Sequence, residues 1–490
     1  MTAIAFDNSY ARLPERFYAR LSAQPVADPQ LLALNEPLAA FLGLDLEWLQ
    51  SADGIAMLAG NAFPNGAASI AQAYAGHQFG NWVPQLGDGR ALMVGEVIAE
   101  DGKRYDIQLK GSGQTPFSRM GDGRAALGPA IREYVMSEAM HALGVPTTRA
   151  LAVLSTGDTV LRDSGPQPGG IVVRVASSHI RVGTFQYFYA REDHDALRLL
   201  VDHSLERHDP DRIGDGAKGL LESVIDRQAT LIARWLHLGF IHGVMNTDNM
   251  TISGETIDYG PCAFLDHYDP GKVFSSIDQF GRYAYANQPN IGQWNLGNFA
   301  QTLLPLLDNN EETAIEIAKQ ALAAYPETFG KAYEAGLRAK IGLATERTED
   351  MALVQDLLKA MASQRADHTR TLRALSNLSA DSDDNDALFF AEFDDRAPLD
   401  RWLVSWRQRL AHETASDGER QAAMKRVNPM IIPRNHRVEE VIAAAYAADF
   451  APFDALNAAL ADPYSDRDLV DHYALAPKPD EVVQATFCGT

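Results

Sequence analysis

The stretch HGVMNTDNMTISGETIDYG, residues 242–260, decides the fold prediction because it places Asp248, Asn249 and Asp258 near turns, directly after a long helical pattern. That pattern carries apolar residues at helical spacing over 220–238, and Gly239 ends it. Magnesium ions prefer one or two oxygen-bearing side chains, with phosphates filling the remaining positions. Asn249 and Asp258 supply such a pair, although taken alone both are better explained as residues that cap turns.

Residues farther out along the chain add to this pair the ordered set that protein kinases use. Kinases combine a glycine loop, a strand Lys, a helix Glu, the sequence H-R-D-L-x-x-x-N and the triplet D-F-G. The corresponding residues here are Gly87-Asp88-Gly89-Arg90, Lys110, Glu133, His242-Gly243-Val244 with Asn249, and Asp258-Tyr259-Gly260. Each element is weak by itself, whereas the ordered set is moderately specific.

The pattern of elements agrees with a two-lobed chain. Strands are predicted at 91–98, 104–110, 150–157 and 169–176, and a helix is predicted over 126–144. After about residue 187 the patterns are mostly helical, apart from two β-like pieces at 249–254 and 256–260, and 310–460 reads as helices. We therefore expect an α+β, protein-kinase-like fold, with a small strand-rich lobe (1–186), a larger helical lobe (187–475) and a C-terminal tail (476–490).

One departure from the kinase pattern changes the expected chemistry. Val244 occupies the position of the kinase catalytic base and cannot accept a proton, and Asp248 is the nearest substitute in sequence. Two interpretations remain open at this point: a silent nucleotide-binding pseudokinase, or an enzyme with altered chemistry. Extra cations favour the second, because Arg binds phosphate through a planar, bidentate fork. We expect Arg90, Lys110, Arg174 and Arg181 to surround one polyphosphate site, although any single Arg is more commonly a surface ion pair.

Composition excludes several classes of protein. The chain has 490 residues, a formal charge of −22 and a sequence pI near 5.0, which disfavours non-specific nucleic-acid binding. We find no apolar run long enough to span a bilayer, no signal-peptide pattern and no coiled-coil heptad. The expectation is a cytoplasmic bacterial monomer without nucleic-acid or membrane partners. The acidic stretch 381–392 matches part of a calcium loop, but Asp386 replaces the required Gly, so a solvated acidic loop is favoured.

At these residues the sequence closely resembles the selenoprotein O family, which comprises protein adenylyltransferases with a pseudokinase fold. The segments that carry the resemblance include AYAGHQFGNWVPQLGDGRA (73–91), DIQLKGSGQTPFSRMGDGRAALGPAIREYVMSEAM (106–140), HGVMNTDNM (242–250) and DYGPCAFLD (258–266). The resemblance covers essentially the whole chain.

The resemblance implies that ATP binds in an orientation inverted relative to kinases, and that AMP is transferred to Ser, Thr or Tyr of proteins while pyrophosphate leaves. It implies acceptors that include redox-stress proteins. It makes Asp248 the proton acceptor and Asn249 and Asp258 the ligands of Mg²⁺, while the choice between Mg²⁺ and Mn²⁺ and that between ATP and UTP stay open. The implied nucleotide-binding residues are Gly87, Gly89, Arg90, Lys110 with its partner Glu133, Asp122, Gly123, Arg174, Arg181 and Asp258.

The two cysteines, Cys262 and Cys488, can be interpreted in two ways. From composition alone they are unrelated thiols. The family, however, ends in a redox-active Cys or selenocysteine, so the resemblance implies a Cys262–Cys488 disulfide that modulates activity. Two rivals to the adenylyltransferase hypothesis remain: an atypical kinase, and a catalytically silent ATP-binding scaffold.

Overall fold

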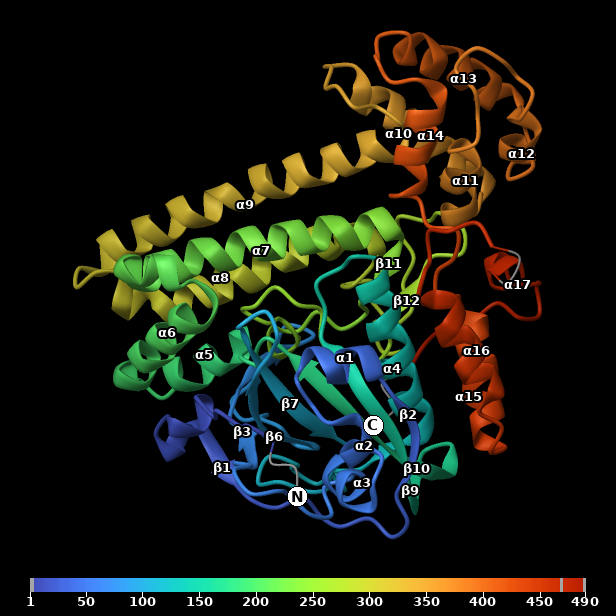
Figure 1. Ribbon diagram of the computed structural model, residues 1–490. Coiled ribbons are helices and arrows are strands. Elements are labelled where there is room, and N and C mark those ends of the chain that lie inside the picture. Colours follow the sequence, from blue (N-terminus) through green and yellow to red (C-terminus); the bar gives the residue numbers. More distant parts are fainter. Residues whose placement is uncertain (1–3, 468–469, 488–490) are drawn as a thin grey trace.

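A mixed arrangement of one large sheet and many helices forms the molecule in this computed structural model, which describes residues 4–467 and 470–487 (Figure 1). The sheet is antiparallel and has the strand order β1-β3-β6-β7-β10-β9-β2, with β8 paired to β10. Its strands are β1 (Tyr18–Arg20), β2 (Gln30–Leu34), β3 (Ile70–Gln72), β6 (Ala91–Ile98), β7 (Arg104–Lys110), β8 (Ala125–Ala126), β9 (Arg149–Arg162) and β10 (Gly165–Ala176). Two separate strand pairs are β4 (Gly76–Gln78) with β5 (Asn81–Val83), and β11 (Phe240–Ile241) with β12 (Ala263–Phe264).

Helices cover both faces of the sheet and continue beyond it. Three short helices share an apolar cluster with one face: α1 (Glu36–Phe41), α2 (Leu46–Leu49) and α3 (Ala52–Leu58). Three others form the layer on the opposite face: α4 (Leu127–Ala142), which packs on the sheet, and α15 (Asn435–Tyr446) and α16 (Ala451–Leu460), which pack on α4. This second face is the one that bears the candidate site.

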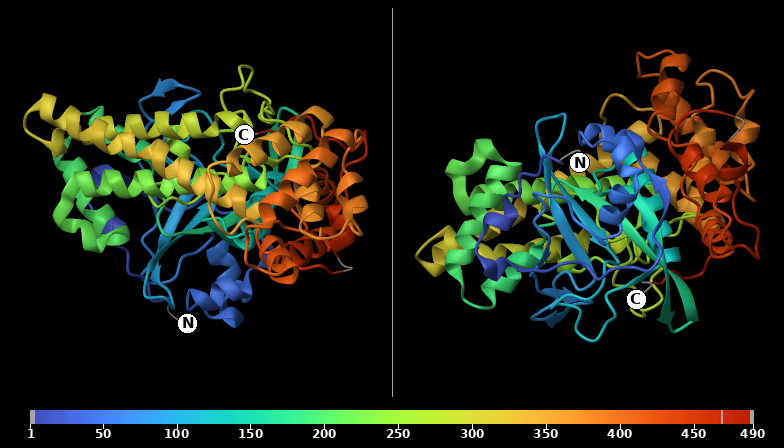
Figure 2. Two further views of the ribbon diagram at one scale, coloured as in Figure 1. Left: turned by 90° about the horizontal axis from the view of Figure 1, so that it is seen from above. Right: turned by 60° about the horizontal axis from the view of Figure 1, so that its bottom comes forward.

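The remaining helices form a long layer and a terminal group. Figure 1 shows α7, α8 and α9 side by side above the sheet, and both views in Figure 2 keep α10–α14, drawn in orange, together at one end. These helices are α5 (Val182–Tyr189), α6 (His194–His208), α7 (Gly216–Leu238), α8 (Gln288–Leu307), α9 (Glu311–Lys340), α10 (Asp350–Gln364), α11 (His368–Leu375), α12 (Asp386–Phe390), α13 (Ala397–Leu410), α14 (Asp417–Lys425) and α17 (Asp471–Ala474). No helix in the described ranges combines the length and the apolar character that crossing a membrane requires.

Strand register places the polar residues of the sheet on the face toward α4. Alternate residues of a strand point to opposite faces, and directly paired residues share a face. On β10, Val172 packs in the apolar cluster of α4, whereas Val173 packs with α1–α3. Lys110 pairs with Val172, and Gln108 pairs with Arg174, two residues farther along. Lys110, Gln108 and Arg174 therefore point to the side that α4 partly covers.

The structure confirms the α+β class and most predicted elements. The strands at 91–98 and 104–110 have the predicted bounds. Strands β9 and β10 are longer than expected because their tips form a two-stranded projection in which Pro166 and Pro168 pair with Leu161 and Thr159. Proline is tolerated there because its missing N–H can face solvent instead of a third strand.

The two β-like pieces predicted at 249–254 and 256–260 are wrong as strands. Within them, Thr251 and Thr256 form isolated bridges with Arg181 and Thr147. Each piece thus pairs with a different segment, and Gly254 turns the chain between them at φ 75°. The short alternating pattern correctly indicated extended backbone at these residues, but it did not indicate that the two pieces would pair with different segments.

The acidic stretch is partly a loop, as favoured, and partly the short helix α12. Asp386 is buried and accepts a hydrogen bond from Arg407 at 2.6 Å, while Glu392 binds Arg370. Within the described ranges, His, Cys, Asp and Glu side chains form no group of three or more that could hold a metal ion. The calcium-loop interpretation therefore finds no support.

Candidate active site

A cleft of about 950 Å³ lies between the α4 side of the sheet and the loop that follows β11. It is lined by residues from the glycine loop, the sheet, the β9–β10 projection and residues 244–261. The predicted site residues on its wall are Gly87, Gly89, Arg90, Lys110, Asp122, Gly123, Arg174, Arg181, Asp248, Asn249 and Asp258. Glu133 stands behind Lys110 on α4, so the structure brings together residues that are up to 171 positions apart in sequence, from Gly87 to Asp258.

Three cations meet at Asp258. The ammonium of Lys110 donates to Asp258 Oδ1 at 2.8 Å and to Glu133 Oε2 at 2.6 Å. Arg174 donates to the same Asp258 oxygen at 2.6 Å and to Glu133 at 3.1 Å, while Arg181 donates to Asp258 Oδ2 at 2.6 Å. Burial alone would raise the pKa of Asp258, but the three cations hold it well below its usual range.

The backbone at Asp258 explains how one carboxylate reaches three partners. Its φ is 62°, in the left-handed region that non-glycine residues rarely adopt. Such strain persists where the surroundings over-determine the conformation. The carboxylate is held by the cations of β7, β10 and the N-terminus of α5, so these elements fix the conformation of Asp258.

Asp248 occupies a different environment in the same cleft. It lies in the 3₁₀ turn Thr247–Asn249, is only 6% exposed, and its backbone oxygen accepts from Arg181 at 2.6 Å. Burial raises the pKa of Asp248 to about 6, so its carboxylate is a stronger base than an exposed Asp. Val244 is buried on the same wall and offers no titratable group.

The glycine loop and the mouth of the cleft are built from close backbone contacts and exposed side chains. Gly87 has φ 78°, and a Cβ there would stand 2.4 Å from the ring of Phe117, so a side chain cannot be accommodated. Met120 and Leu161 line the cleft but are 100% and 76% exposed, and Asp122 binds Arg162 at 2.8 Å beside them. The mouth is therefore open and partly apolar, whereas the cationic group lies deep.

Comparisons with known proteins show the family of this chain. The family model described as protein adenylyltransferase SelO matches residues 1–461. The chain belongs to this family. It is 58% identical over 488 residues to a protein nucleotidyltransferase YdiU of Bradyrhizobium diazoefficiens, covering 99% of both chains. It is 58% identical over 491 residues to the YdiU protein of Rhizobium rhizogenes (99% of this chain, 97% of the relative), and 57% identical over 493 residues to that of Rhizobium meliloti (100% of both).

The oxygen donors in the cleft fit a magnesium ion that shares its coordination with phosphates. Asn249 donates its amide nitrogen to the backbone oxygen of Val244 at 3.0 Å, which leaves the amide oxygen as the end available to a ligand. Asp258 contributes a carboxylate with about four acceptor sites; its three cations use both sites of Oδ1 and one of Oδ2, which leaves one site on Oδ2 for a metal ion. Two protein ligands suffice for Mg²⁺ when phosphate oxygens and water complete the set.

The C-terminal tail returns to the same region. Thr486 is 2% exposed, and its hydroxyl donates to the backbone oxygen of Pro261 at 2.5 Å. Cys262 is the next residue after Pro261 and is buried. Cys488 lies outside the described residues, so the Cys262–Cys488 disulfide stays a prediction, and the anchored Thr486 brings the described end of the tail beside the Cys262 segment.

Sequence reasoning missed several side chains that shape the cleft. The guanidinium of Arg181 stacks on Tyr74 at 4.7 Å, and Gln108 accepts from Arg174. The position of Gln108, two residues before Lys110 on one strand, was a usable signal because such residues share a face. Gln78, whose amide reaches Asp248 at 3.3 Å, gave no such signal, because its role depends on a contact across 170 residues of chain.

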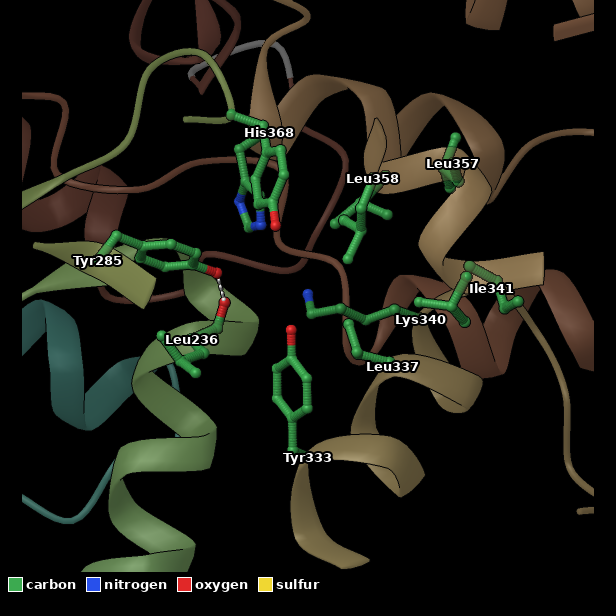
Figure 3. Close-up of a pocket in the computed structure, with 12 residues that line it drawn as sticks. Leu236, Tyr285, Tyr333, Leu337, Lys340, Ile341, Leu357, Leu358 and His368 are labelled. Carbon is green, nitrogen blue, oxygen red and sulfur yellow. Dashed lines mark hydrogen bonds between the residues drawn. The ribbon is translucent and has the colours of Figure 1, made fainter. Parts of the chain in front are cut away.

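A second, much smaller cavity lies among α7, α9, α10 and α11, away from the cleft. Figure 3 shows Lys340 pointing into it, with Tyr333, His368 and Leu358 on its walls. The Lys340 ammonium donates to backbone oxygen of Val427 at 2.8 Å and to the side chain of Asn428 at 3.1 Å, and among the described ion pairs it takes part in none. With a volume of about 10 Å³ the cavity is too small for a substrate.

Proposed function

We propose that this chain transfers AMP from ATP to Ser, Thr or Tyr hydroxyls of proteins and releases pyrophosphate. The observation that carries the proposal is the cationic group at the closed end of the cleft. The side chains of Lys110, Arg174 and Arg181 are 11%, 3% and 2% exposed and converge on one carboxylate. Such a group stabilises the charge that develops on a polyphosphate leaving group, because preorganised cations act most strongly where water is excluded.

The depth of these cations supports an inverted ATP. The nucleoside is the bulky, partly apolar end of ATP, and the wide mouth with Met120, Leu161 and Gly123 suits it better than the buried, charged end. The terminal phosphates then point inward to Lys110 and Arg174. In this orientation the α-phosphorus lies between the two ends, on the side where Asp248 lines the wall.

The residues take the following roles in the proposed reaction. Asp248 accepts the proton of the acceptor hydroxyl, whose oxygen attacks the α-phosphorus. The bond from that phosphorus to the bridging oxygen breaks, and pyrophosphate leaves with the electron pair, stabilised by Lys110, Arg174 and Arg181. A Mg²⁺ ion held by Asn249 and Asp258 would neutralise further phosphate charge when bound.

We also propose that the architecture is a variant of the two-lobed kinase fold, divided near residue 186 and with a tail from 476. In kinases a strand Lys pairs with a helix Glu, as Lys110 on β7 does with Glu133 on α4 at 2.6 Å. The metal-binding Asn and the D-F-G Asp correspond to Asn249 and Asp258. Val244, in place of the kinase base, disfavours transfer of the γ-phosphoryl group.

Labelled ATP tests the proposal. The chain is incubated with Mg²⁺, bacterial lysate proteins as acceptors, and ATP labelled at either the α- or the γ-phosphorus. Transfer of label from the α-position alone is expected. Asp258→Asn should abolish this transfer. Asp248→Ala should lower its rate about 10²–10⁴-fold, since a general base contributes that much. Transfer of γ-label would identify a kinase, and ATP binding without any transfer would identify a silent scaffold.

A further inference from the structure

The hairpin formed by β4 and β5 lies directly on the turn that carries Asp248. The backbone N–H of His77 donates to the hydroxyl of Thr247 at 2.7 Å. The backbone N–H of Phe79 donates to the side-chain oxygen of Asn246 at 2.9 Å. The hairpin is thus fixed to this turn on both sides of residue 78, independently of the side chain at that position.

The two oxygens of the Asp248 carboxylate have different surroundings. Oδ1 is buried without a hydrogen-bond partner, and it lies so close to Gly76 that a Cβ there would stand 2.5 Å away. Shielded in this way, Oδ1 cannot meet an incoming hydroxyl. Oδ2 is therefore the oxygen left for the acceptor. It receives the side-chain amide of Gln78 at 3.3 Å, and in the described part of the chain no other side chain donates to this carboxylate.

We propose that Gln78 is a positioning residue: its amide fixes the Asp248 carboxylate so that Oδ2 faces the acceptor hydroxyl. The inference rests on the proposed function. One lone pair of Oδ2 takes the amide hydrogen, and another remains for the proton of the acceptor. Without the amide, the carboxylate can rotate about its side-chain bonds, and misplacement of a reacting group by about 1 Å can cost about 10²-fold in rate.

The direct test replaces Gln78 by Met, which keeps the length of the side chain and removes the donor. The turnover number for α-label transfer is expected to fall about 10- to 100-fold, while the KM for ATP stays unchanged, because Gln78 forms no hydrogen bond with the cations that face phosphate. Asn81→Ala, at the exposed first residue of β5 and opposite Gln78 in the same hairpin, is the matched control and should behave as the parent. Both variants should melt at the temperature of the parent chain.

A double-mutant cycle separates positioning from a general structural effect. If Gln78 acts through Asp248, Gln78→Met causes no further loss when it is added to Asp248→Ala. An equal fold-loss in both backgrounds, a raised KM with unchanged turnover, or full activity of Gln78→Met in an active parent would each overturn the positioning role alone. A parent chain that transfers no α-label would overturn the proposed function, and the role of Gln78 with it.

Discussion

The buried lysine of Figure 3 makes chain stability depend on pH in a way that a single substitution can isolate. Burial lowers the pKa of Lys340 from 10.5 to about 7. In the unfolded chain the residue stays protonated up to its ordinary pKa, so between these two values the unfolded state binds more protons than the folded state. Stability from this residue therefore rises with pH across that window. Lys340→Met removes the dependence.

The size of the effect follows from the two pKa values. Full charging of Lys340 in the folded chain costs about 1.4 kcal/mol for each unit of its downward shift. Raising the pH from about 7 to about 9 relieves about 2 kcal/mol of that cost in the parent and none in the Met variant. For 490 residues that melt together, the entropy of unfolding is about 1 kcal/mol per kelvin. The melting temperature of the parent should therefore rise by about 2 °C relative to that of the variant over this pH range.

Differential scanning calorimetry of both proteins at the two pH values measures how the difference in melting temperature between parent and variant changes with pH. Lys359→Met is the matched control: it makes the same chemical change on α10, but its lysine side chain is 74% exposed and pairs with Asp356. The melting temperature of the control should differ from that of the parent by the same amount at both pH values. A parent-minus-variant difference that does not grow with pH would show that Lys340 titrates normally, and would refute the argument from its burial.

Three further outcomes are expected. Lys110→Met removes the ammonium between Glu133 and Asp258, and should lower α-label transfer at least about 10²-fold, a loss typical of one electrostatic donor; near-parent rates would contradict its role. Chelation of divalent cations should abolish α-label transfer, and added Mg²⁺ should restore it. Asn249→Ala should raise the Mg²⁺ concentration that gives the half-maximal rate. Activity that resists chelation would exclude the metal site. Intact mass should fall by two hydrogens under oxidising conditions if Cys262 and Cys488 pair, whereas two thiols that remain alkylatable would dismiss the disulfide.

Local patterns predicted the parts of the structure that depend on neighbours in sequence. The strand over 104–110 and the helix that carries Glu133 follow from periodicity, and their order along the chain indicated the 2.6 Å pair between Lys110 and Glu133. The chain after Asn249 was mispredicted because its extended residues pair with distant segments rather than with each other. Gln78 was missed for a similar reason: the local sequence of a short hairpin does not predict which distant turn the hairpin will contact.

The physical cost of the charged group in the cleft is itself an argument for a ligand. Lys110, Arg174 and Arg181 contact Glu133 and Asp258 in a nearly dry environment, with three positive charges against two negative. Buried ion pairs of this kind are often no more stabilising than apolar residues of similar volume, because desolvation offsets their attraction. The fold therefore gains little from the group, in which the positive charges outnumber the negative ones by one, with the buried carboxyls of Asp88 and Asp248 in the same cleft. Under the proposed function a polyphosphate binds these cations, which accounts for three buried positive charges around one carboxylate in a chain with a net charge of −22.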